Sequence, residues 1–125
     1  MKFHQADILK PWDFADRKYD LITFSLMLEH IELLNDVFKE AARVIAPNGF
    51  LYVGELHPFK QYAGSKARFD SENGQQVVTC FNHHVSDFTQ AAKANGFTIV
   101  EMNEYFDDDD KTSIPRILAI LFKRL

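Results

Sequence analysis

An adjacent acid and base, Glu29 and His30, form the pair of residues in this sequence best suited to chemistry. A neutral imidazole can take a proton from a hydroxyl or an amine while that group attacks an electrophile. The pair closes the stretch YDLITFSLMLEHI, residues 19–31. The same two residues could instead begin a helix, with Glu29 near the positive end of the helix dipole and His30 packed beside Leu28. Both interpretations fit the sequence equally well.

A second group of polar side chains lies in and around the irregular segment 57–85. Loops that follow strands commonly carry specificity, so these side chains could converge over a site and recognise a substrate. Each of them could also be a surface residue or a loop-packing residue, and His57, which precedes Pro58, has the best claim to a role. The group consists of Glu55, His57, Tyr62, Arg68, His83 and His84.

No metal site is predicted from the residue types and their spacing. A zinc site would need several of these histidines at ligand spacing, and a single cysteine gives no support for one. Cys80 is expected to be a small buried apolar side chain rather than a nucleophile. The acidic run Asp107 to Asp110 lacks the spaced ligands and the distal Glu of an EF-hand, so it predicts a solvated turn.

Hydrophobic periodicity predicts the elements that position these residues. The unbroken run from Leu21 to Phe24 is typical of a strand covered on both faces. Apolar residues at intervals of three and four over 34–45 predict an amphipathic helix, which residues 47–49 (Pro-Asn-Gly) should end. The other predicted elements are a short strand over 2–8, strands over 50–56, 97–102 and 117–122, and a helix capped by Ser86 and closed by Asn95 and Gly96.

This order of elements predicts an α/β fold with a mostly parallel sheet and a closing antiparallel hairpin. In such sheets, ligands bind beyond the carboxyl ends of the strands. This rule selects Asp7, residues 25–30 and residues 55–57 as the site, because each of them follows a predicted strand.

Composition limits the class of protein. A chain of 125 residues with 46% apolar residues and a net charge of −4 predicts one soluble domain over 1–125, and no apolar run is long enough to span a membrane. No cluster of Lys and Arg is available to neutralise phosphates, so a nucleic-acid partner is not expected. The single cysteine and the lack of a signal-peptide pattern favour a cytoplasmic location.

Four segments, in this order, resemble the class I S-adenosylmethionine-dependent methyltransferases: QADI (5–8), YDLITFSLMLEHI (19–31), FKEAARVIAPNGFLYVGELHP (38–58) and DFTQAAKANGFTIVEM (87–102). The most specific feature is a strand introduced by Tyr-Asp, a helix ending in Arg-Val-Ile and a Pro-Asn-Gly turn, where the family usually has Pro-Gly-Gly. The resemblance implies a Rossmann-like sheet, S-adenosylmethionine as cofactor and a small-molecule substrate. It also implies direct displacement, in which a substrate O, N or C atom attacks the sulfonium methyl group.

The resemblance further implies cofactor-binding residues. Asp7 would accept a hydrogen bond from the adenine amino group, with the backbone of Ile8 beside it. Judged by residue type alone, Asp7 could equally cap a turn. Ser25 and Leu26 would end the strand that passes beneath the transferring methyl group, where a small serine allows a ligand to approach closely.

His30 would be the catalytic base, with Glu29 beside it. Ubiquinone O-methyltransferases use a similar Glu-His pair, together with an earlier Glu, to hold a metal ion. Leu26 occupies that earlier position here, so the set is incomplete and no metal is expected.

The five glycines, at positions 49, 54, 64, 74 and 96, cannot form the family's Gly-x-Gly-x-Gly turn. The chain therefore resembles the later part of the domain, truncated at the N-terminus and beginning near the family's third strand. The glycine-rich turn contacts the methionine part of the cofactor and a later acid holds its ribose, so weak or absent cofactor binding is expected.

A sheet truncated in this way would expose the 19–25 strand along one edge. An apolar unpaired edge predicts either a homo-oligomer formed through that edge or a rearranged N-terminal segment that fills the gap. The leading hypothesis is thus a methyltransferase-like protein, and the alternative is a degenerate, non-catalytic domain that serves as an oligomerisation or interaction module. Another doubly wound enzyme, such as a reductase, is disfavoured because its phosphate-binding glycines are equally absent.

Overall fold

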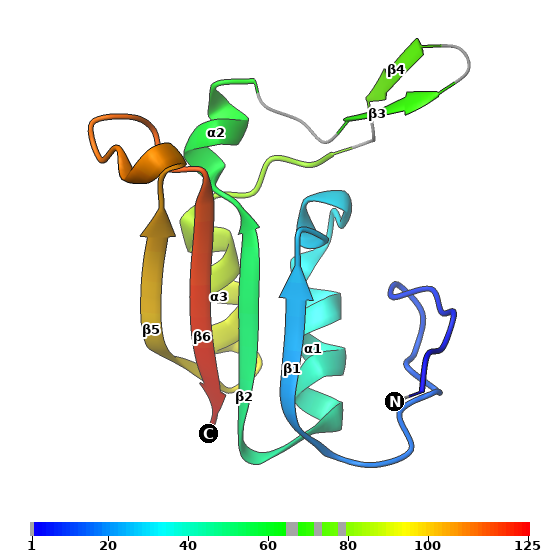
Figure 1. Cartoon of the computed structure of the whole chain (residues 1–125). Helices are drawn as coiled ribbons and strands as arrows, with labels where there is room; N and C mark the ends of the chain where they lie inside the picture. Colours follow the sequence, from blue (N-terminus) through cyan, green and yellow to red (C-terminus); the bar gives the residue numbers. More distant parts are fainter. Residues whose placement is uncertain (1, 65–67, 72–73, 78–79) are drawn as a thin grey trace.

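The computed structural model describes residues 2–64, 68–71, 74–77 and 80–125. Its main element is a four-stranded mixed sheet of order β1-β2-β6-β5, with α1 and α3 on one face (Figure 1). The strands of this sheet are β1 (Tyr19–Ser25), β2 (Ile45–Leu56), β5 (Phe97–Tyr105) and β6 (Ile117–Arg124). The helices are η1 (Leu28–His30), α1 (Leu34–Val44), α2 (Pro58–Tyr62), α3 (Val85–Ala94) and η2 (Asp107–Asp109), and β3 (Arg68–Ser71) pairs with β4 (Gly74–Val77).

The pairing of the strands confirms the predicted α/β fold, in a mixed sheet with one parallel and two antiparallel strand pairs. β1 is parallel to β2, with Phe24 opposite Val53, and β6 is antiparallel to both β2 and β5. β1, β2 and β5 therefore run in one direction, and the β5–β6 hairpin supplies the predicted antiparallel closure. The parallel strands deliver their carboxyl ends to one edge of the sheet, where the candidate site residues follow.

The core forms between this sheet and α1 and α3. Val37, Phe38 and Ala41 on α1 are fully buried, as the three-and-four spacing predicts. The ring of Phe38 packs edge-to-face against Phe97 and Phe122, with ring centroids 6.4 and 5.9 Å apart. Aromatic pairs in this geometry add to the free energy gained by burying the rings.

The predicted end of α1 was placed too late. α1 ends at Val44, and residues 46–49 form an irregularity within β2, because Tyr19 pairs with Ile45 whereas Leu21 pairs with Phe50. A residue before proline avoids helical geometry, which stops the helix ahead of Pro47. Asn48 takes the left-handed conformation, with φ of 63°, that a tight turn here requires.

The predicted strand over residues 2–8 is wrong. The described residues of this segment are irregular and lead into a turn, in which the Asp7 side chain accepts a hydrogen bond from the Leu9 N–H (2.9 Å). A strand needs a hydrogen-bonded neighbour, and the segment has none among the described residues. Trp12 instead anchors it, by donating from Nε1 to the Ile8 carbonyl (3.1 Å) and packing edge-to-face on Phe24.

β1 is not covered on both faces, contrary to prediction. It is an edge strand, paired with β2 alone in the described part of the chain, and Leu21 is 57% exposed. Beside it lies an apolar hollow of about 460 Å³, which residues of β1, Ile8 and Trp12 of the N-terminal segment, and Met27 before η1 line. The exposed edge was itself expected, and the unbroken apolar run matches a strand that a wider sheet would bury.

The irregular segment 57–85 contains more regular structure than predicted, since α2 and the β3–β4 hairpin fall within it. The cap of α3 also differs from the prediction: His84, not Ser86, is the N-cap residue, and the Asp87 carboxylate accepts a hydrogen bond from the His84 backbone N–H (2.9 Å). The acidic run forms an exposed turn at η2, as expected, with Asp107 bound to the Arg116 guanidinium.

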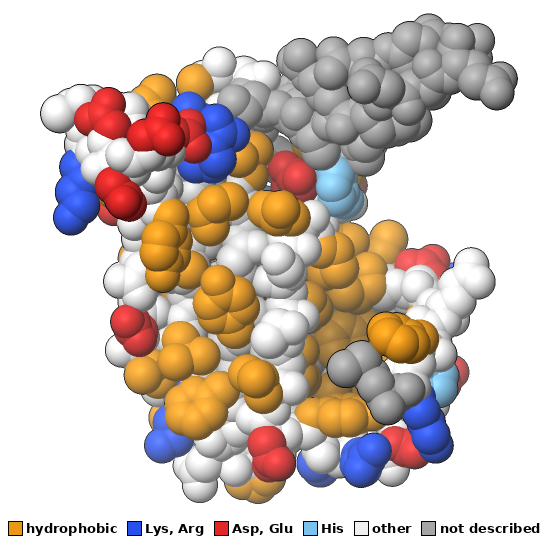
Figure 2. All heavy atoms as spheres, in the orientation of Figure 1, with side chains coloured by type: hydrophobic (Ala, Val, Ile, Leu, Met, Phe, Trp, Pro, Cys, Tyr) orange, Lys and Arg blue, Asp and Glu red, His pale blue; other side chains and the backbone are white. Residues whose placement is uncertain are grey.

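The face of the sheet opposite α1 and α3 is open. Figure 2 shows hydrophobic side chains scattered across this face, over β2, β6 and β5. None of the helices in the described ranges is both long enough and apolar enough to cross a membrane. The exposed large apolar residues of the sheet strands include Leu21, Phe50, Tyr52, Ile99, Val100, Met102 and Tyr105.

Candidate functional site

The candidate site begins where β1 turns into η1. The chain reverses at Leu26, whose φ of 50° is unusual for a residue with a branched side chain. Its N–H donates to the Gly54 carbonyl (2.8 Å), so the turn is held to β2. Ser25, also paired with Gly54, and Leu26 are both exposed at this end of the sheet. A strained backbone held in place by a neighbouring strand is a common feature of functional sites.

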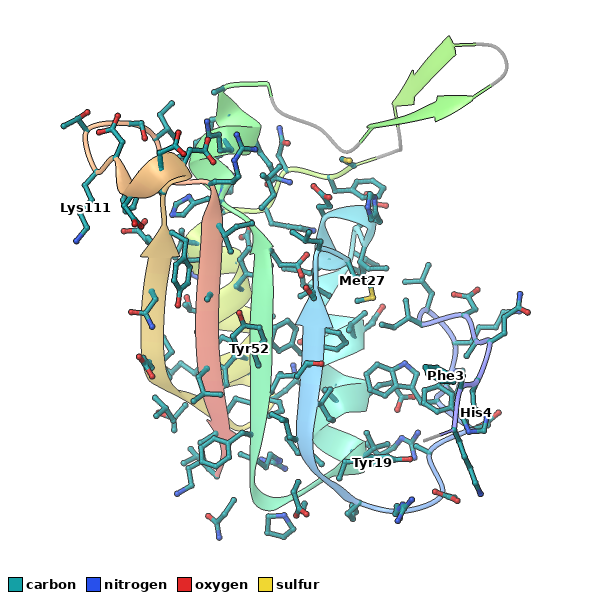
Figure 3. All side chains as sticks on the ribbon, in the orientation of Figure 1. Phe3, His4, Tyr19, Met27, Tyr52 and Lys111 are labelled. Atoms are coloured by element: carbon teal, nitrogen blue, oxygen red, sulfur yellow. The ribbon has the colours of Figure 1, made fainter. Side chains whose placement is uncertain are left out.

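Glu55, at the end of β2, fixes the start of η1. Its fully buried carboxylate accepts hydrogen bonds from the backbone N–H groups of Met27 (2.9 Å) and Leu28 (2.6 Å). The first N–H groups of a helix have no partner within the helix, and a carboxylate satisfies them well. Figure 3 shows Met27 at this junction of β1 and η1. The carboxylate thereby positions the two residues that follow, Glu29 and His30.

Burial raises the pKa of Glu55 from 4.5 to about 7. Desolvation disfavours the charged carboxylate, and this effect exceeds the lowering of the pKa by the backbone N–H groups of η1. The nearby charge of Glu29 raises the pKa further. Glu55 therefore changes its protonation state near neutral pH, which makes it the most strongly perturbed acid at this edge of the sheet.

Glu29, His30 and Cys80 come together over the end of β1. Nε2 of His30 lies 3.6 Å from Oε1 of Glu29, and its Nδ1 lies 3.9 Å from Sγ of Cys80. Glu29 is buried, whereas the His30 side chain is 30% exposed and can reach a ligand. The Phe81 N–H donates to the Glu29 carbonyl (2.7 Å), which holds the segment after Cys80 against η1. The pair lies in a helical turn, as one interpretation of the sequence predicts, and a catalytic role for the accessible imidazole stays a prediction.

His57 is buried between α2 and β5. Its Nδ1 accepts the Phe59 N–H (3.1 Å), so its Nε2 carries the proton and donates it to the Glu104 carboxylate (2.5 Å). His57 is also the N-cap of α2. These contacts fix the orientation of the imidazole. Substrate recognition by His57 stays a prediction.

The other predicted substrate-binding residues fall into separate places. The Tyr62 hydroxyl and Nδ1 of His84 form a hydrogen bond at the surface. His83 is buried, with Nε2 bonded to the Ile31 carbonyl (2.6 Å), so it joins η1 to the start of α3. Arg68 lies in β3, and its side chain lies outside the described part of the structure. The structure thus brings Tyr62 and His84 together, and the ring of Phe59 connects them to His57, with its centroid 4.7 Å from that of His57 and 6.1 Å from that of Tyr62.

Asp7 and Ile8 lie on the N-terminal segment rather than at the end of a strand. The turn-capping alternative for Asp7 is observed, since its carboxylate accepts the Leu9 N–H. Ile8 lines the apolar hollow beside β1, which Met27 also lines. Pockets of this size and apolar character can accept a small planar ligand.

Sequence reasoning missed three features of the site. The position of Glu55 two residues before His57 gave no sign that its carboxylate would turn back to cap η1. Glu104 lies beyond the strand predicted over 97–102, and the sequence gives no sign of its bond to His57, which lies 47 residues away. Cys80 is predicted to be a small buried apolar side chain, but it is only half-buried, and the fold places its sulfur beside His30.

Comparison with known proteins supplies the context for this geometry. Residues 1–53 match the family model described as a methyltransferase domain. An uncharacterized methyltransferase of Emericella nidulans is 40% identical over 81 residues, a stretch that covers 63% of this chain and 28% of that protein. The match thus spans little more than a quarter of the curated relative.

Solved structures extend the likeness to the whole chain. A putative S-adenosylmethionine-dependent methyltransferase from Listeria monocytogenes superposes with a TM-score of 0.76 at 19% identity, covering 98% of this chain and 68% of that one. One from Mesorhizobium loti gives a TM-score of 0.74 at 16% identity, covering 97% and 68%. These likenesses confirm the Rossmann-like methyltransferase fold predicted from the sequence.

Proposed function

We propose that this chain, a class I S-adenosylmethionine-dependent methyltransferase domain in its fold and in the family match of residues 1–53, takes part in methyl transfer to a small-molecule acceptor. In this proposal the described residues supply the acceptor side and the adenine side of the site. The observation that carries it is the accessible His30 imidazole, held at the carboxyl end of β1 beside the buried Glu29. Ligands of open α/β sheets bind at this edge.

The described residues fit part of the cofactor. Ile8 and Met27 line an apolar hollow of about 460 Å³ along β1, which suits the flat adenine ring. In this proposal Asp7 would hold the adenine amino group, and Ser25 and Leu26 would contact the part of the cofactor that carries the methyl group. When bound, S-adenosylmethionine supplies an electrophilic methyl group. No glycine-rich turn is available in this sequence for the methionine part, so we expect weak binding by this chain.

The residues of the chain then have separate tasks. Glu55 fixes the start of η1, the element that carries His30. His30 takes the proton that the acceptor loses as it forms its new bond to carbon. Glu29, whose Oε1 lies 3.6 Å from Nε2 of His30, holds the imidazole in place. His57, Tyr62, Arg68, His83 and His84 remain candidates for acceptor recognition.

Labelled methyl transfer tests this function. The wild-type chain is incubated with millimolar methyl-labelled S-adenosylmethionine and a mixed set of phenols, amines and carboxylic acids, and label in the small-molecule products is counted. We expect slow transfer that His30→Asn lowers by about 10²-fold or more, the usual contribution of a general base. The affinity for S-adenosylhomocysteine should be the same in both proteins. Transfer unchanged in His30→Asn would remove His30 from the mechanism.

A second candidate function is a non-catalytic interaction module. The observation that favours it is the exposed edge of β1, with Leu21 57% exposed and paired residues on the β2 side alone in the described part of the chain. Such an edge can pair with the same edge of a second copy and form a homo-oligomer. Absence of methyl transfer under the conditions above would favour this candidate. A cytoplasmic location fits both candidates and stays a prediction.

A further inference from the structure

The cluster at the end of β1 has the composition of a metal site rather than of a plain acid-base pair. Glu29, His30 and Cys80 each offer one ligand atom, and these atoms lie within 4.8 Å of one another. Two of the ligands are neighbours in η1, while Cys80 comes from the segment before α3. The sequence alone could not predict that these three residues form one site, because Cys80 lies 50 residues beyond His30.

The buried Glu29 carboxylate also favours a bound cation. The side chain of Glu29 is only 7% exposed. Among the residues that the structure describes, none forms a hydrogen bond with its Oε2 atom. A buried carboxylate oxygen without a partner carries a large desolvation cost, and native proteins usually satisfy it with a water molecule or an ion. A cation bound between Glu29, His30 and Cys80 would satisfy this oxygen.

We propose that Glu29, His30 and Cys80 bind a divalent cation of the Zn²⁺ class. Oxygen, nitrogen and sulfur donors together suit a borderline cation, whereas Mg²⁺ and Ca²⁺ prefer oxygen alone. Tetrahedral zinc places such ligand atoms about 3.3–3.8 Å apart, so small side-chain rotations close the present separations. Three protein ligands leave the fourth position for water or another ligand.

The site has a clear consequence for the segment that follows Cys80. Phe81 already binds η1, through its N–H to the Glu29 carbonyl, and its own carbonyl lies 3.5 Å from Nε2 of Gln61. A cation would add a direct bond from Cys80 and hold this segment over the end of β1. An imidazole nitrogen that binds a metal ion has no free lone pair and cannot accept a proton. His30 therefore either binds the cation through a given nitrogen or acts as a base at that nitrogen, but not both at once.

Titration of the wild-type chain with ZnCl₂, followed by calorimetry in a phosphine-reduced buffer, tests the site. We expect one ion per chain with micromolar or tighter affinity, and a binding that weakens by about tenfold or more in Cys80→Ala and in Glu29→Gln. His4→Asn is the matched control, since His4 lies on the N-terminal segment and away from Met27 and η1 (Figure 3). It should bind as the wild type does.

Two results would overturn the proposal: no binding to the wild type at millimolar Zn²⁺, or equal binding by wild type and Cys80→Ala, which would indicate an adventitious ion only. Co²⁺ gives a further readout, because a cysteine ligand produces a thiolate-to-metal charge-transfer band in the near ultraviolet. That band should vanish in Cys80→Ala.

A measurement on the wild type guards against variants that fold poorly. Cys80 is the single cysteine of the chain, so alkylation by iodoacetamide reports on it alone. We expect Zn²⁺ to slow this alkylation by about tenfold or more, because the bound thiolate is no longer available as a nucleophile, and a chelator to restore the rate. An unchanged rate in the presence of Zn²⁺ would contradict the proposed role of Cys80. Both readouts are independent of methyl transfer.

Discussion

At the scale of single residues, Glu55 connects the chemistry of the site to its architecture. Its carboxylate lies at the end of β2, yet it bonds to the N–H groups that begin η1, so it couples the two parallel strands at their carboxyl ends. The cost of burying the charge is only partly offset by these bonds, as its raised pKa shows. The charged form of Glu55 should therefore destabilise the folded chain relative to the neutral form.

The raised pKa of Glu55 predicts that the stability of the metal-free protein depends on pH. The pKa of Glu55 is raised from 4.5 to about 7 on folding, so between these values the folded state binds more protons than the unfolded state. The stability that Glu55 contributes by binding a proton in the folded state is fully present below pH 4.5 and is lost as the pH rises toward 7. The free energy of unfolding should fall by about 3 kcal/mol at most over this range. Urea unfolding across this range, with a chelator present, measures the change.

Glu55→Gln supplies the control for that measurement. The amide keeps the shape of the side chain and an oxygen that can accept from η1, but it does not ionise. Its free energy of unfolding should fall less than that of the wild type between pH 4.5 and 7. Parallel curves for the two proteins would show that Glu55 is not the group responsible.

The His57–Glu104 bond predicts a loss of stability on mutation. Glu104→Ala leaves the buried Nε2–H of His57 without this acceptor, which should lower the free energy of unfolding by about 1–3 kcal/mol. Glu104→Gln retains an acceptor oxygen and should cost less. Equal losses in the two variants, measured by urea unfolding, would show that the bond contributes nothing beyond the contacts of the side chain.

At the scale of elements, α1 supplies the main packing surface for the sheet. Phe38 is fully buried and contacts the rings of Phe97 and Phe122. Phe38→Ala should lower the free energy of unfolding by about 3–5 kcal/mol, because it removes apolar contacts and leaves a cavity. The exposed neighbour Lys39 is the matched control, and Lys39→Ala should change stability by about 0.5 kcal/mol or less. A small effect of Phe38→Ala would contradict the packing.

The elements that local sequence could predict are those with strong periodicity. The spacing of Val37, Phe38 and Ala41 sufficed for α1, and the apolar run of 117–122 sufficed for β6. Periodicity failed for residues 2–8, because a strand exists only with a partner and local sequence does not reveal whether the partner is there. It also could not place Cys80 beside His30, since that contact depends on how η1 and the segment before α3 meet.

At the scale of the whole molecule, the exposed edge and the open face of the sheet are the features that most need a partner. If the β1 edges of two copies pair, the chain should be a dimer by size-exclusion chromatography with light scattering. Leu21→Lys places a charge on that edge and should shift the chain toward the monomer. Leu125→Lys, at a 75% exposed position beyond the sheet, should not. A wild-type monomer at all concentrations would contradict pairing through β1.

The described residues fit only part of the cofactor. The hollow beside β1 suits adenine, and the sequence offers no glycine-rich turn for the methionine part. If so, the methionine part of a ligand adds little to its affinity. Adenosine and S-adenosylhomocysteine should then bind this chain with similar, weak affinities, because both present the same adenine and ribose.

Isothermal titration of the wild-type chain with these two ligands measures that comparison directly. We expect dissociation constants that agree within about threefold, a difference in binding free energy below about 1 kcal/mol. Low-micromolar binding of S-adenosylhomocysteine, with much weaker binding of adenosine, would show that the chain holds the methionine part as well. That result would contradict the division of the site proposed for this chain.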